Sequence, residues 1–231
     1  MKKATLPLFI LIISFASGLQ RVNAQDAFVM NTQFLQEGKV KYAEKELHYG
    51  DMEGTPYLYD GWIPGSAKLS DGKTYNNVLL KYDEIQDMPI FKYAEQDSAL
   101  KFALQPVEFT LNFVGKPGHF VNGFKPADDA DMTSFYLVLS DGNLKLLKRT
   151  VKRINKRSGY SSTDATIVVN ENTTYYLAKN KMPVKIKNDN KAVIAALSDK
   201  SEKIKQYISD NKMNVKKDDD FARVVDYYNS L

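Results

Sequence analysis

The sequence has two histidines, His48 and His119, and these are the candidates for a base or an imidazole metal ligand at neutral pH. They lie beside turn residues, in KELHYGD and GKPGHFVNG, and neither has a second histidine or a carboxylate at metal-ligand spacing. The chain contains no cysteine, which excludes a thiolate nucleophile, a zinc–thiolate site and a disulfide framework. We therefore predict no catalytic residue of these types and no metal site.

Carboxylates are the remaining candidates for chemistry. The acidic clusters at 128–131 and 218–220 lack the glycine and distant glutamate of an EF-hand loop, so we interpret them as a solvated turn and a helix start. The chain has no G-x-S-x-G elbow and no glycine-rich phosphate loop, and we expect no cofactor. A catalytic pair of carboxylates stays open as an alternative, because the fold and not the spacing brings such a pair together.

The stretch 140–157, SDGNLKLLKRTVKRINKR, is the most basic part of the chain. As a helix it would be basic and amphipathic, which is typical of membrane or nucleic-acid binding. The Asp141-Gly142 turn and the β-branched Thr150, Val151 and Ile154 favour a strand instead, whose charged end would protect a sheet edge. An anion-binding module built on this strand is the alternative. Its basic residues are Lys145, Lys148, Arg149, Lys152, Arg153, Lys156 and Arg157.

Three aromatic residues crowd the turn-rich stretch TPYLYDGWIPG, namely Tyr57, Tyr59 and Trp62. Such a cluster would stack on sugar rings or anchor a partner protein, since Tyr and Trp dominate contact energies at interfaces. The alternative, which we favour, is packing within a small β domain, where most large aromatic side chains are needed inside.

The first residues, MKKATLPLFILIISFASGLQRVNAQ, have the layout of a secretory signal peptide cleaved before Gln25. Their apolar run is too short to span a bilayer, so we expect no transmembrane segment in the mature chain. Because the chain has no cysteine, we expect no amino-terminal lipid anchor, and we predict a periplasmic or extracellular protein. Cleavage leaves 29 of the 32 basic residues against 28 acidic ones, which gives no global attraction to nucleic acid.

The elements that must position these residues are mostly short strands. VEFTLNFV, residues 107–114, alternates apolar and polar residues, and hairpin turns are predicted at Asp71-Gly72, Asp141-Gly142 and Asn180-Lys181. After residue 187 the period becomes helical. Asp199 is expected to cap one amphipathic helix, and the acidic run at 218–220 begins another.

The predicted fold is α+β and mainly β: antiparallel hairpins and a meander form a sheet or sandwich, with two short amphipathic helices at the C-terminus. We expect residues 1–24 to be the signal peptide and residues 25–187 a β-rich body, with a candidate internal boundary near 125–132. Residues 188–231 are expected to form a helical segment packed on that body.

Three stretches, 56–83, 135–153 and 204–231, together resemble an uncharacterised family of small exported β-rich proteins of Bacteroidota-type Gram-negative bacteria. The resemblance implies an envelope or secreted location and supplies no activity. We therefore expect a non-enzymatic binding or structural protein of the cell envelope or surface, with an envelope protein or a polysaccharide as its partner. The alternatives are a secreted carboxylate-dependent hydrolase and the anion-binding module.

Overall fold

The structure, a computed structural model, describes residues 40–42, 52–94, 99–157 and 166–231. The expected signal peptide and His48 lie outside these residues. Within the described part of the chain, no helix is both long and apolar enough to cross a membrane.

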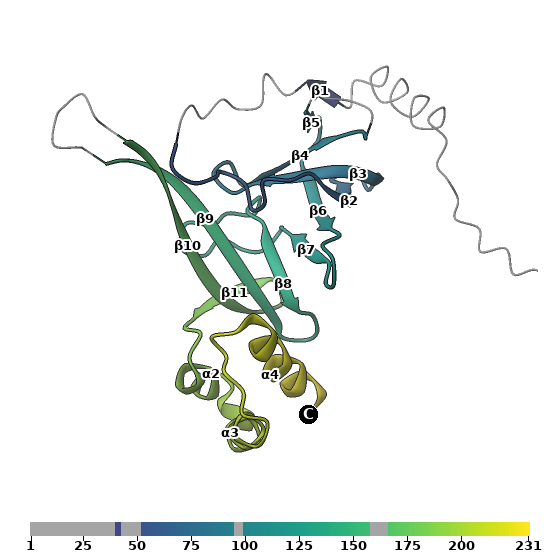
Figure 1. Cartoon of the computed structure of the whole chain (residues 1–231). Coiled ribbons are helices and arrows are strands. Elements are labelled where there is room, and N and C mark those ends of the chain that lie inside the picture. Colours follow the sequence, from purple (N-terminus) through teal and green to yellow (C-terminus); the bar gives the residue numbers. More distant parts are fainter. Residues whose placement is uncertain (1–39, 43–51, 95–98, 158–165) are drawn as a thin grey trace, which may run out of the picture.

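The strands form one sheet in which every neighbouring pair is antiparallel, in the order β1-β5-β4-β3-β2-β6-β7-β8-β9-β10-β11 (Figure 1). The predicted fold, mainly β and antiparallel with helices at the C-terminus, is confirmed. The strands are β1 (Val40–Tyr42), β2 (Ile63–Leu69), β3 (Thr74–Asp83), β4 (Met88–Lys92), β5 (Leu100–Phe102), β6 (Pro106–Leu111), β7 (Gly118–Val121), β8 (Tyr136–Ser140), β9 (Lys145–Arg157), β10 (Thr166–Lys179) and β11 (Met182–Ile186).

The three predicted hairpin turns all occur, between β2 and β3, between β8 and β9, and between β10 and β11. Asn180 and Lys181 both have positive φ angles, 53° and 59°. Two such residues in succession are what a two-residue hairpin of the type I′ kind requires. Local turn chemistry therefore fixes these strand pairs.

The basic stretch is a strand, as predicted, because β9 pairs with β10 from Lys145 opposite Ala178 to Arg157 opposite Thr166. The expectation that it protects a sheet edge is wrong for the first part of β9, which lies between β8 and β10. Beyond Lys148 no residue of β9 pairs with β8. The far ends of β9 and β10 project from the rest of the sheet as a long hairpin (Figure 1).

The sheet folds back on itself, so that β9 meets the end of β3. The backbone N–H of Lys152 donates a hydrogen bond to the carbonyl oxygen of Glu84 (3.2 Å). The segment before β2 also passes here. Glu53 forms an isolated β-bridge with Val168, and Tyr57 forms one with Asp83. We call this contact the seam.

The concave face of the curved sheet, here the inner face, encloses the main apolar core. Its rings pack closely: Phe109 stacks on Phe120 with centroids 4.6 Å apart, and Tyr82 lies 5.1 Å from Phe109. On the opposite face, Phe124 and Ala130 pack against Tyr136, Leu147 and Tyr176. The buried residues of the main core are Ala67, Leu69, Tyr75, Val78, Leu80, Tyr82, Phe91, Tyr93, Leu100, Phe109, Leu111, Phe120 and Phe135.

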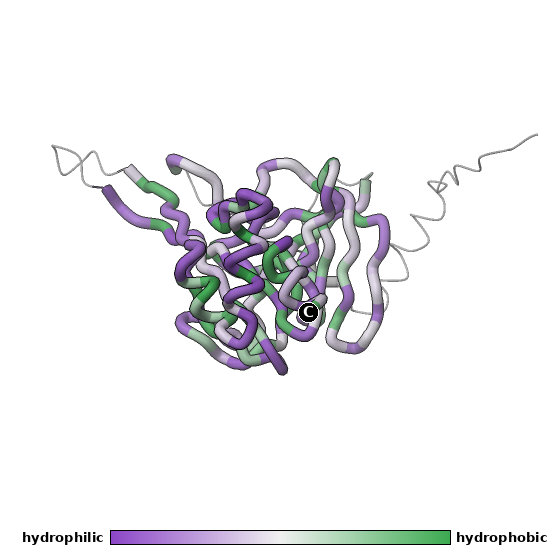
Figure 2. The backbone as a smooth tube through the Cα atoms, turned by 90° about the horizontal axis from the view of Figure 1, so that it is seen from below, coloured by the Kyte–Doolittle hydropathy of each residue, from purple (hydrophilic) through white to green (hydrophobic). Residues whose placement is uncertain are grey.

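The helices gather at one end of the sheet, next to β8, β9 and β11 (Figure 1), and lie toward the viewer when the molecule is seen from below (Figure 2). Phe221, Val224 and Val225 of α4 are completely buried in a second apolar cluster with Leu146 of β9 and Leu177 of β10. The helical elements are α2 (Asn190–Ala196), η1 (Ser198–Lys200), α3 (Ser201–Asp210) and α4 (Asp218–Ser230).

Two details of the helices differ from the sequence expectations. The helix α2 was not predicted; its N-cap is Asp189, whose carboxylate accepts a hydrogen bond from the backbone N–H of Ala192 (2.8 Å). Asp199 does not cap α3, which follows Lys200 without a side-chain cap. Instead Asp199 accepts a hydrogen bond from the Tyr228 hydroxyl (3.0 Å) and so ties η1 to α4.

Candidate functional site: a charged cavity at the seam

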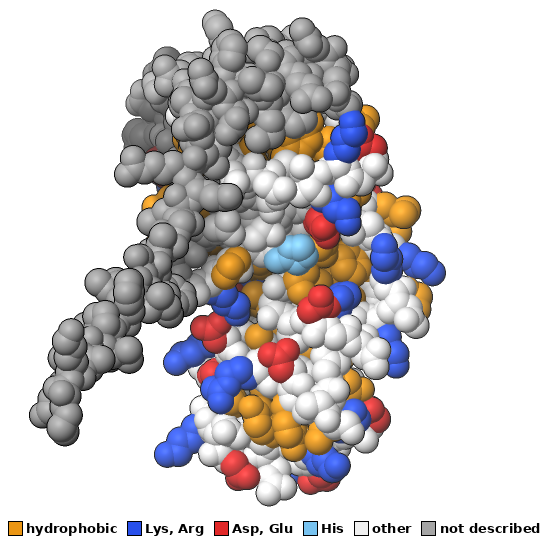
Figure 3. Space-filling model, turned by 90° about the vertical axis from the view of Figure 1, so that its right-hand side faces the viewer, with side chains coloured by type: hydrophobic (Ala, Val, Ile, Leu, Met, Phe, Trp, Pro, Cys, Tyr) orange, Lys and Arg blue, Asp and Glu red, His pale blue; other side chains and the backbone are white. Residues whose placement is uncertain are grey.

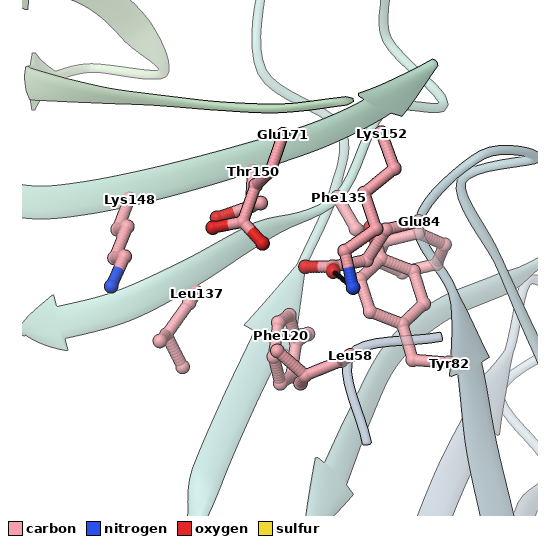
Figure 4. Close-up of a pocket in the computed structure, with 10 residues that line it drawn as sticks. All are labelled: Leu58, Tyr82, Glu84, Phe120, Phe135, Leu137, Lys148, Thr150, Lys152 and Glu171. Carbon is pink, nitrogen blue, oxygen red and sulfur yellow. Dashed lines mark ion pairs between the residues drawn. The ribbon is translucent and has the colours of Figure 1, made fainter. Parts of the chain in front are cut away.

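A cavity of about 120 Å³ lies on the inner face at the seam (Figure 4). Apolar and charged side chains share its lining; of the charged ones, Glu84 and Lys152 are buried and Glu171 is exposed. The side chains of β9 and β10 approach it from one side, and those of β3, β7 and β8 from the other. The cavity is lined by Leu58, Tyr82, Glu84, Phe120, Phe135, Leu137, Lys148, Thr150, Lys152 and Glu171.

The polar side chains of β9 and β10 form one wall of the cavity, and the two-residue period of a strand explains why they lie together. Side chains two residues apart share one face of a strand, so Lys148, Thr150 and Lys152 of β9 all face the cavity. Glu171 and Thr173 of β10 lie directly opposite Lys152 and Thr150 and share that face. The two threonine hydroxyls are hydrogen-bonded across the pair (3.1 Å).

A buried ion pair closes the seam. Lys152 and Glu84 are only 7% and 2% exposed, and the Lys152 Nζ lies 3.0 Å from the Glu84 Oε2. The same ammonium group donates a hydrogen bond to the backbone oxygen of Tyr57 (2.5 Å). Burial raises the pKa of Glu84 above its usual value, and the hydrogen bond and charge of Lys152 act against that rise. Either charge alone would be strongly destabilising in such a buried position. The folded state therefore keeps the two side chains together.

The second lysine of the wall links the cavity to the helices. The Lys148 Nζ lies 2.8 Å from the Asp218 Oδ2, at the first residue of α4. The Tyr175 hydroxyl donates to the other oxygen of the same carboxylate (2.7 Å). Burial, and then the hydrogen bond and charge of Asp218, raise the pKa of Tyr175. The negative charge of Asp218 also suits the amino-terminal end of a helix.

Arg149 supports the cavity from the opposite face of β9. It is 8% exposed and contacts the carboxylates of Asp87 and Asp129, each at 3.1 Å. Asp87 also accepts a hydrogen bond from the hydroxyl of Tyr82 (2.6 Å), a residue of the cavity lining. Burial, followed by the charge of Asp87, raises the pKa of Tyr82 well above its usual value. This network fixes the ring of Tyr82 from behind.

The charges around the cavity leave one carboxylate without a partner. Lys152 is paired with Glu84, and Lys148 is paired with Asp218. Glu171 is exposed and forms no ion pair with any described residue. The rings of Phe120, Phe135 and Tyr82 line the same cavity. Aromatic faces and an unpaired carboxylate both favour an organic cation.

The predicted basic site is not an open patch. Six of its seven residues lie next to carboxylates, in the pairs Lys145–Asp141, Lys148–Asp218, Arg149–Asp87, Lys152–Glu84, Arg153–Asp129 and Arg157–Glu53. Lys156 has no ion pair with a described residue. Figure 3 draws a different face of the molecule, the right-hand side of Figure 1, and there basic and acidic side chains are interspersed. These contacts do not favour the anion-binding alternative.

Only two of the three residues of the predicted aromatic cluster come together. Tyr57 and Trp62 are half-buried and lie against Lys81, whose Nζ is 4.5 Å and 5.1 Å from their ring centroids. Tyr59 is 55% exposed and meets the edge of Phe113 instead. Only the backbone of Tyr57, which accepts from Lys152, reaches the seam.

The other candidates from the sequence have structural partners. His119 of β7 contacts the Thr110 hydroxyl through its Nδ1 (3.2 Å). Asp128 accepts a hydrogen bond from the Tyr176 hydroxyl (2.9 Å), so part of the acidic cluster at 128–131 is docked and is not simply a solvated turn. Among the described residues, no group of three or more His, Cys, Asp and Glu side chains is arranged to hold a metal ion.

From the sequence we singled out the two lysines of the cavity, Lys148 and Lys152. We did not single out Glu84, Glu171 or the aromatic side chains of the lining. No spacing in the sequence relates Glu84 to Lys152, because their contact forms only when the sheet folds back. Comparison with known proteins adds no assignment, since no family model, no curated protein and no solved structure matches the chain.

Proposed function

We propose that this chain is an exported, non-enzymatic binding protein of the bacterial envelope, and that the seam cavity binds a small organic cation. The observation that carries the proposal is the cavity itself, whose lining combines apolar and aromatic side chains with charged groups, one of them a carboxylate that forms no ion pair with a described residue. Binding sites in proteins are commonly concave, mostly apolar and supplied with a few convergent polar groups.

The size and chemistry of the cavity define the ligand class. A volume of about 120 Å³ is slightly below that of the roughly 150 Å³ cavity that holds benzene. A ligand of about five or six non-hydrogen atoms therefore suits it. Its ammonium group would lie at Glu171, and its apolar body would contact Phe120 and Leu58. We expect the Lys152–Glu84 ion pair to stay intact when the ligand is bound.

Three compounds of one length test this assignment: butylamine, butanol and butyrate. Isothermal titration and protein NMR at neutral pH should show the amine binding at least tenfold more tightly than the other two. Glu171→Gln should remove that preference without unfolding the protein, because Glu171 is exposed. Glu202→Gln, an exposed carboxylate of α3, is the matched control and should bind as wild type. Equal binding of all three compounds would contradict the proposal.

The carboxylate-dependent hydrolase is a second candidate because of one observation. Burial raises the pKa of Glu84, the property of a general acid, and Glu171 lines the same cavity. Hydrolysis of a panel of 4-nitrophenyl glycosides would distinguish the two. Turnover by the wild type that disappears in both Glu84→Gln and Glu171→Gln would favour the hydrolase, whereas no turnover together with amine binding favours the binding protein.

A further inference from the structure

A second concave site lies at the other end of the molecule, between the β10–β11 hairpin and the helices. It has a volume of about 320 Å³ and is open to solvent. It is independent of the seam cavity, since the two share no lining residue. We call it the groove. The residues that line it are Leu144, Leu177, Lys179, Met182, Val184, Lys185, Ile186, Ala196, Leu197 and Tyr228.

The groove exists because the helices cover only part of the inner face of the hairpin. Leu177 lies opposite Val184, and Lys179 opposite Met182, so these side chains share one face. Leu177 is 8% exposed under the helices, whereas Val184 is 67% and Met182 48% exposed. Apolar side chains at β-strand spacing therefore continue past the edge of the helical layer.

The walls of the groove are fixed. Leu197, at the end of α2, is 1% exposed and forms its floor. Tyr228 of α4 forms a wall and is held by Asp199 at its hydroxyl and by Lys200, whose Nζ donates to the Tyr228 backbone oxygen (3.1 Å). Because Asp199 is engaged by Tyr228, its carboxylate is not free to attract a cation into the groove.

The charged groups among the lining residues are both cations. Lys179 lies on the groove face beside Met182 and forms no ion pair with any described residue. Lys185 is 59% exposed and lies 3.4 Å from Asp128, on the far side of β11. The lining contains no aspartate or glutamate. An apolar trough with the Lys179 ammonium group beside it is complementary to an amphiphile with an anionic head.

An added β-strand is a poorer occupant. β11 is an edge strand, and edge strands do accept extended peptides. However, the two-residue turn at 180–181 directs the N–H groups of Met182 and Val184 toward β10, which leaves Pro183 among the residues facing outward. Proline has no N–H to donate, so the edge lacks part of the ladder that a peptide would need.

From these observations we infer that the groove binds a single-chain fatty acid in monomeric form. Its alkyl chain contacts Leu177, Val184 and Leu197, and its carboxylate lies at Lys179. The groove is about twice the volume of the roughly 150 Å³ cavity that holds benzene, which corresponds to a chain of about twelve carbons. This inference does not depend on the proposed ligand of the seam cavity.

The test uses three probes with one chain and different heads: dodecanoate, dodecanol and dodecyltrimethylammonium, each below its micelle concentration. Titration calorimetry should show dodecanoate binding to the full mature chain at least fivefold more tightly than dodecanol, with the cationic probe weakest. In protein labelled at the methionine methyl groups, the Met182 resonance should move and the Met88 resonance, from β4, should not. Equal affinity for all three heads would overturn the inference.

Two pairs of variants localise the site. Val184→Asp should weaken dodecanoate binding at least tenfold, whereas Val114→Asp, the same change at a fully exposed valine between β6 and β7, should leave it unchanged. Lys179→Gln should abolish the preference for dodecanoate over dodecanol, with Lys216→Gln as the control. Because Val184 is exposed, its variant should keep the wild-type melting temperature.

Other occupants are outcomes of the same experiments. A chain that sediments as a dimer, and becomes a monomer on Val184→Asp, would show that a second copy fills the groove. Binding to anionic lipid vesicles without binding to monomeric dodecanoate would show a membrane-facing surface. Either result overturns the fatty-acid site. Glu171→Gln must bind dodecanoate as wild type does, and this separates a failure of the groove from a failure of the seam cavity.

Discussion

The inner face of β9 and β10 is closed at its two ends by different physical means. At one end Leu146 and Leu177 are buried in an apolar cluster with α4. At the other end Lys152 is buried against Glu84 by an ion pair. Lys148 and Thr150 lie between the two, and Lys148 joins them by contacting Asp218 of the helix.

The two ends contribute to stability in different ways. Apolar burial stabilises by the area removed from water and tolerates changes of pH and salt. A buried ion pair adds little net stability compared with apolar residues of the same shape, but breaking it is strongly destabilising. The helical end therefore contributes stability through buried apolar area, whereas the seam selects one alignment of β9 against β3 and leaves a cavity with charged groups in its lining.

The largest effect is expected from Val225→Asp in α4. Val225 is completely buried, so the variant places a carboxylate in an apolar contact and should lower the free energy of unfolding by about 4 kcal/mol or more. Arg223→Ala, an exposed change on the same helix, should cost less than about 0.5 kcal/mol. Urea unfolding curves measure both, and an unchanged midpoint for Val225→Asp would show that α4 does not depend on the sheet.

Lys152→Met at the seam should cost about 3 to 5 kcal/mol, because Glu84 would keep a buried charge without a partner. The double variant Lys152→Met with Glu84→Leu should recover most of that loss. Lys156→Met, an exposed change on the same strand, is the control. A double variant as unstable as the single one would mean that the pair itself, and not the lone charge, holds the seam.

The pH dependence of the seam follows from the raised pKa of Glu84. A carboxyl group whose folded pKa exceeds its unfolded value disfavours the folded state when ionised, and that penalty disappears as the pH falls through the folded pKa. The stability of the wild type relative to Glu84→Gln should therefore increase as the pH is lowered from neutrality toward the usual value of 4.5. Carboxyl NMR should place the Glu84 midpoint above 4.5; a midpoint below it would refute this.

The smallest effect is expected at the projecting end of β9. Replacing Arg153, Lys156 and Arg157 together with Gln should change the unfolding free energy by less than about 1 kcal/mol, since the pairs with Asp129 and Glu53 are exposed. Thermal melts in low and high salt measure this. A loss of unfolding free energy as large as that of Lys152→Met would show that the end of β9, too, is part of the seam.

The difference between Lys152 and Arg153 shows how far sequence reasoning extends. The two are adjacent, basic and equivalent as parts of the 145–157 stretch, yet one is buried and the other exposed. Alternation along the strand predicts that they point to opposite faces. Which face is covered depends on where Glu84 comes to lie, and the period of β9 contains no information on that point.

The helical segment gives the same contrast at shorter range. Asp218, Asp219 and Asp220 marked the start of α4 correctly, because a helix dipole favours negative charge in the first turn. The cap of α2 at Asp189 was present in the sequence as an aspartate before a short apolar run, but a helix of seven residues gives too weak a periodic pattern. Asp199 had the pattern of a cap, and the Tyr228 hydroxyl took its carboxylate instead.

By itself, therefore, the sequence determined the hairpins, the strand character of 145–157 and two of the helices. Each follows from interactions between residues near one another in the chain: positive φ angles in tight turns, alternation along a strand and charge at a helix end. The seam, its cavity and the groove were decided only by the tertiary structure. They depend on how the curved sheet brings Glu84 to Lys152 and how far the helices extend over β11, and such contacts are set by the packing of the whole chain.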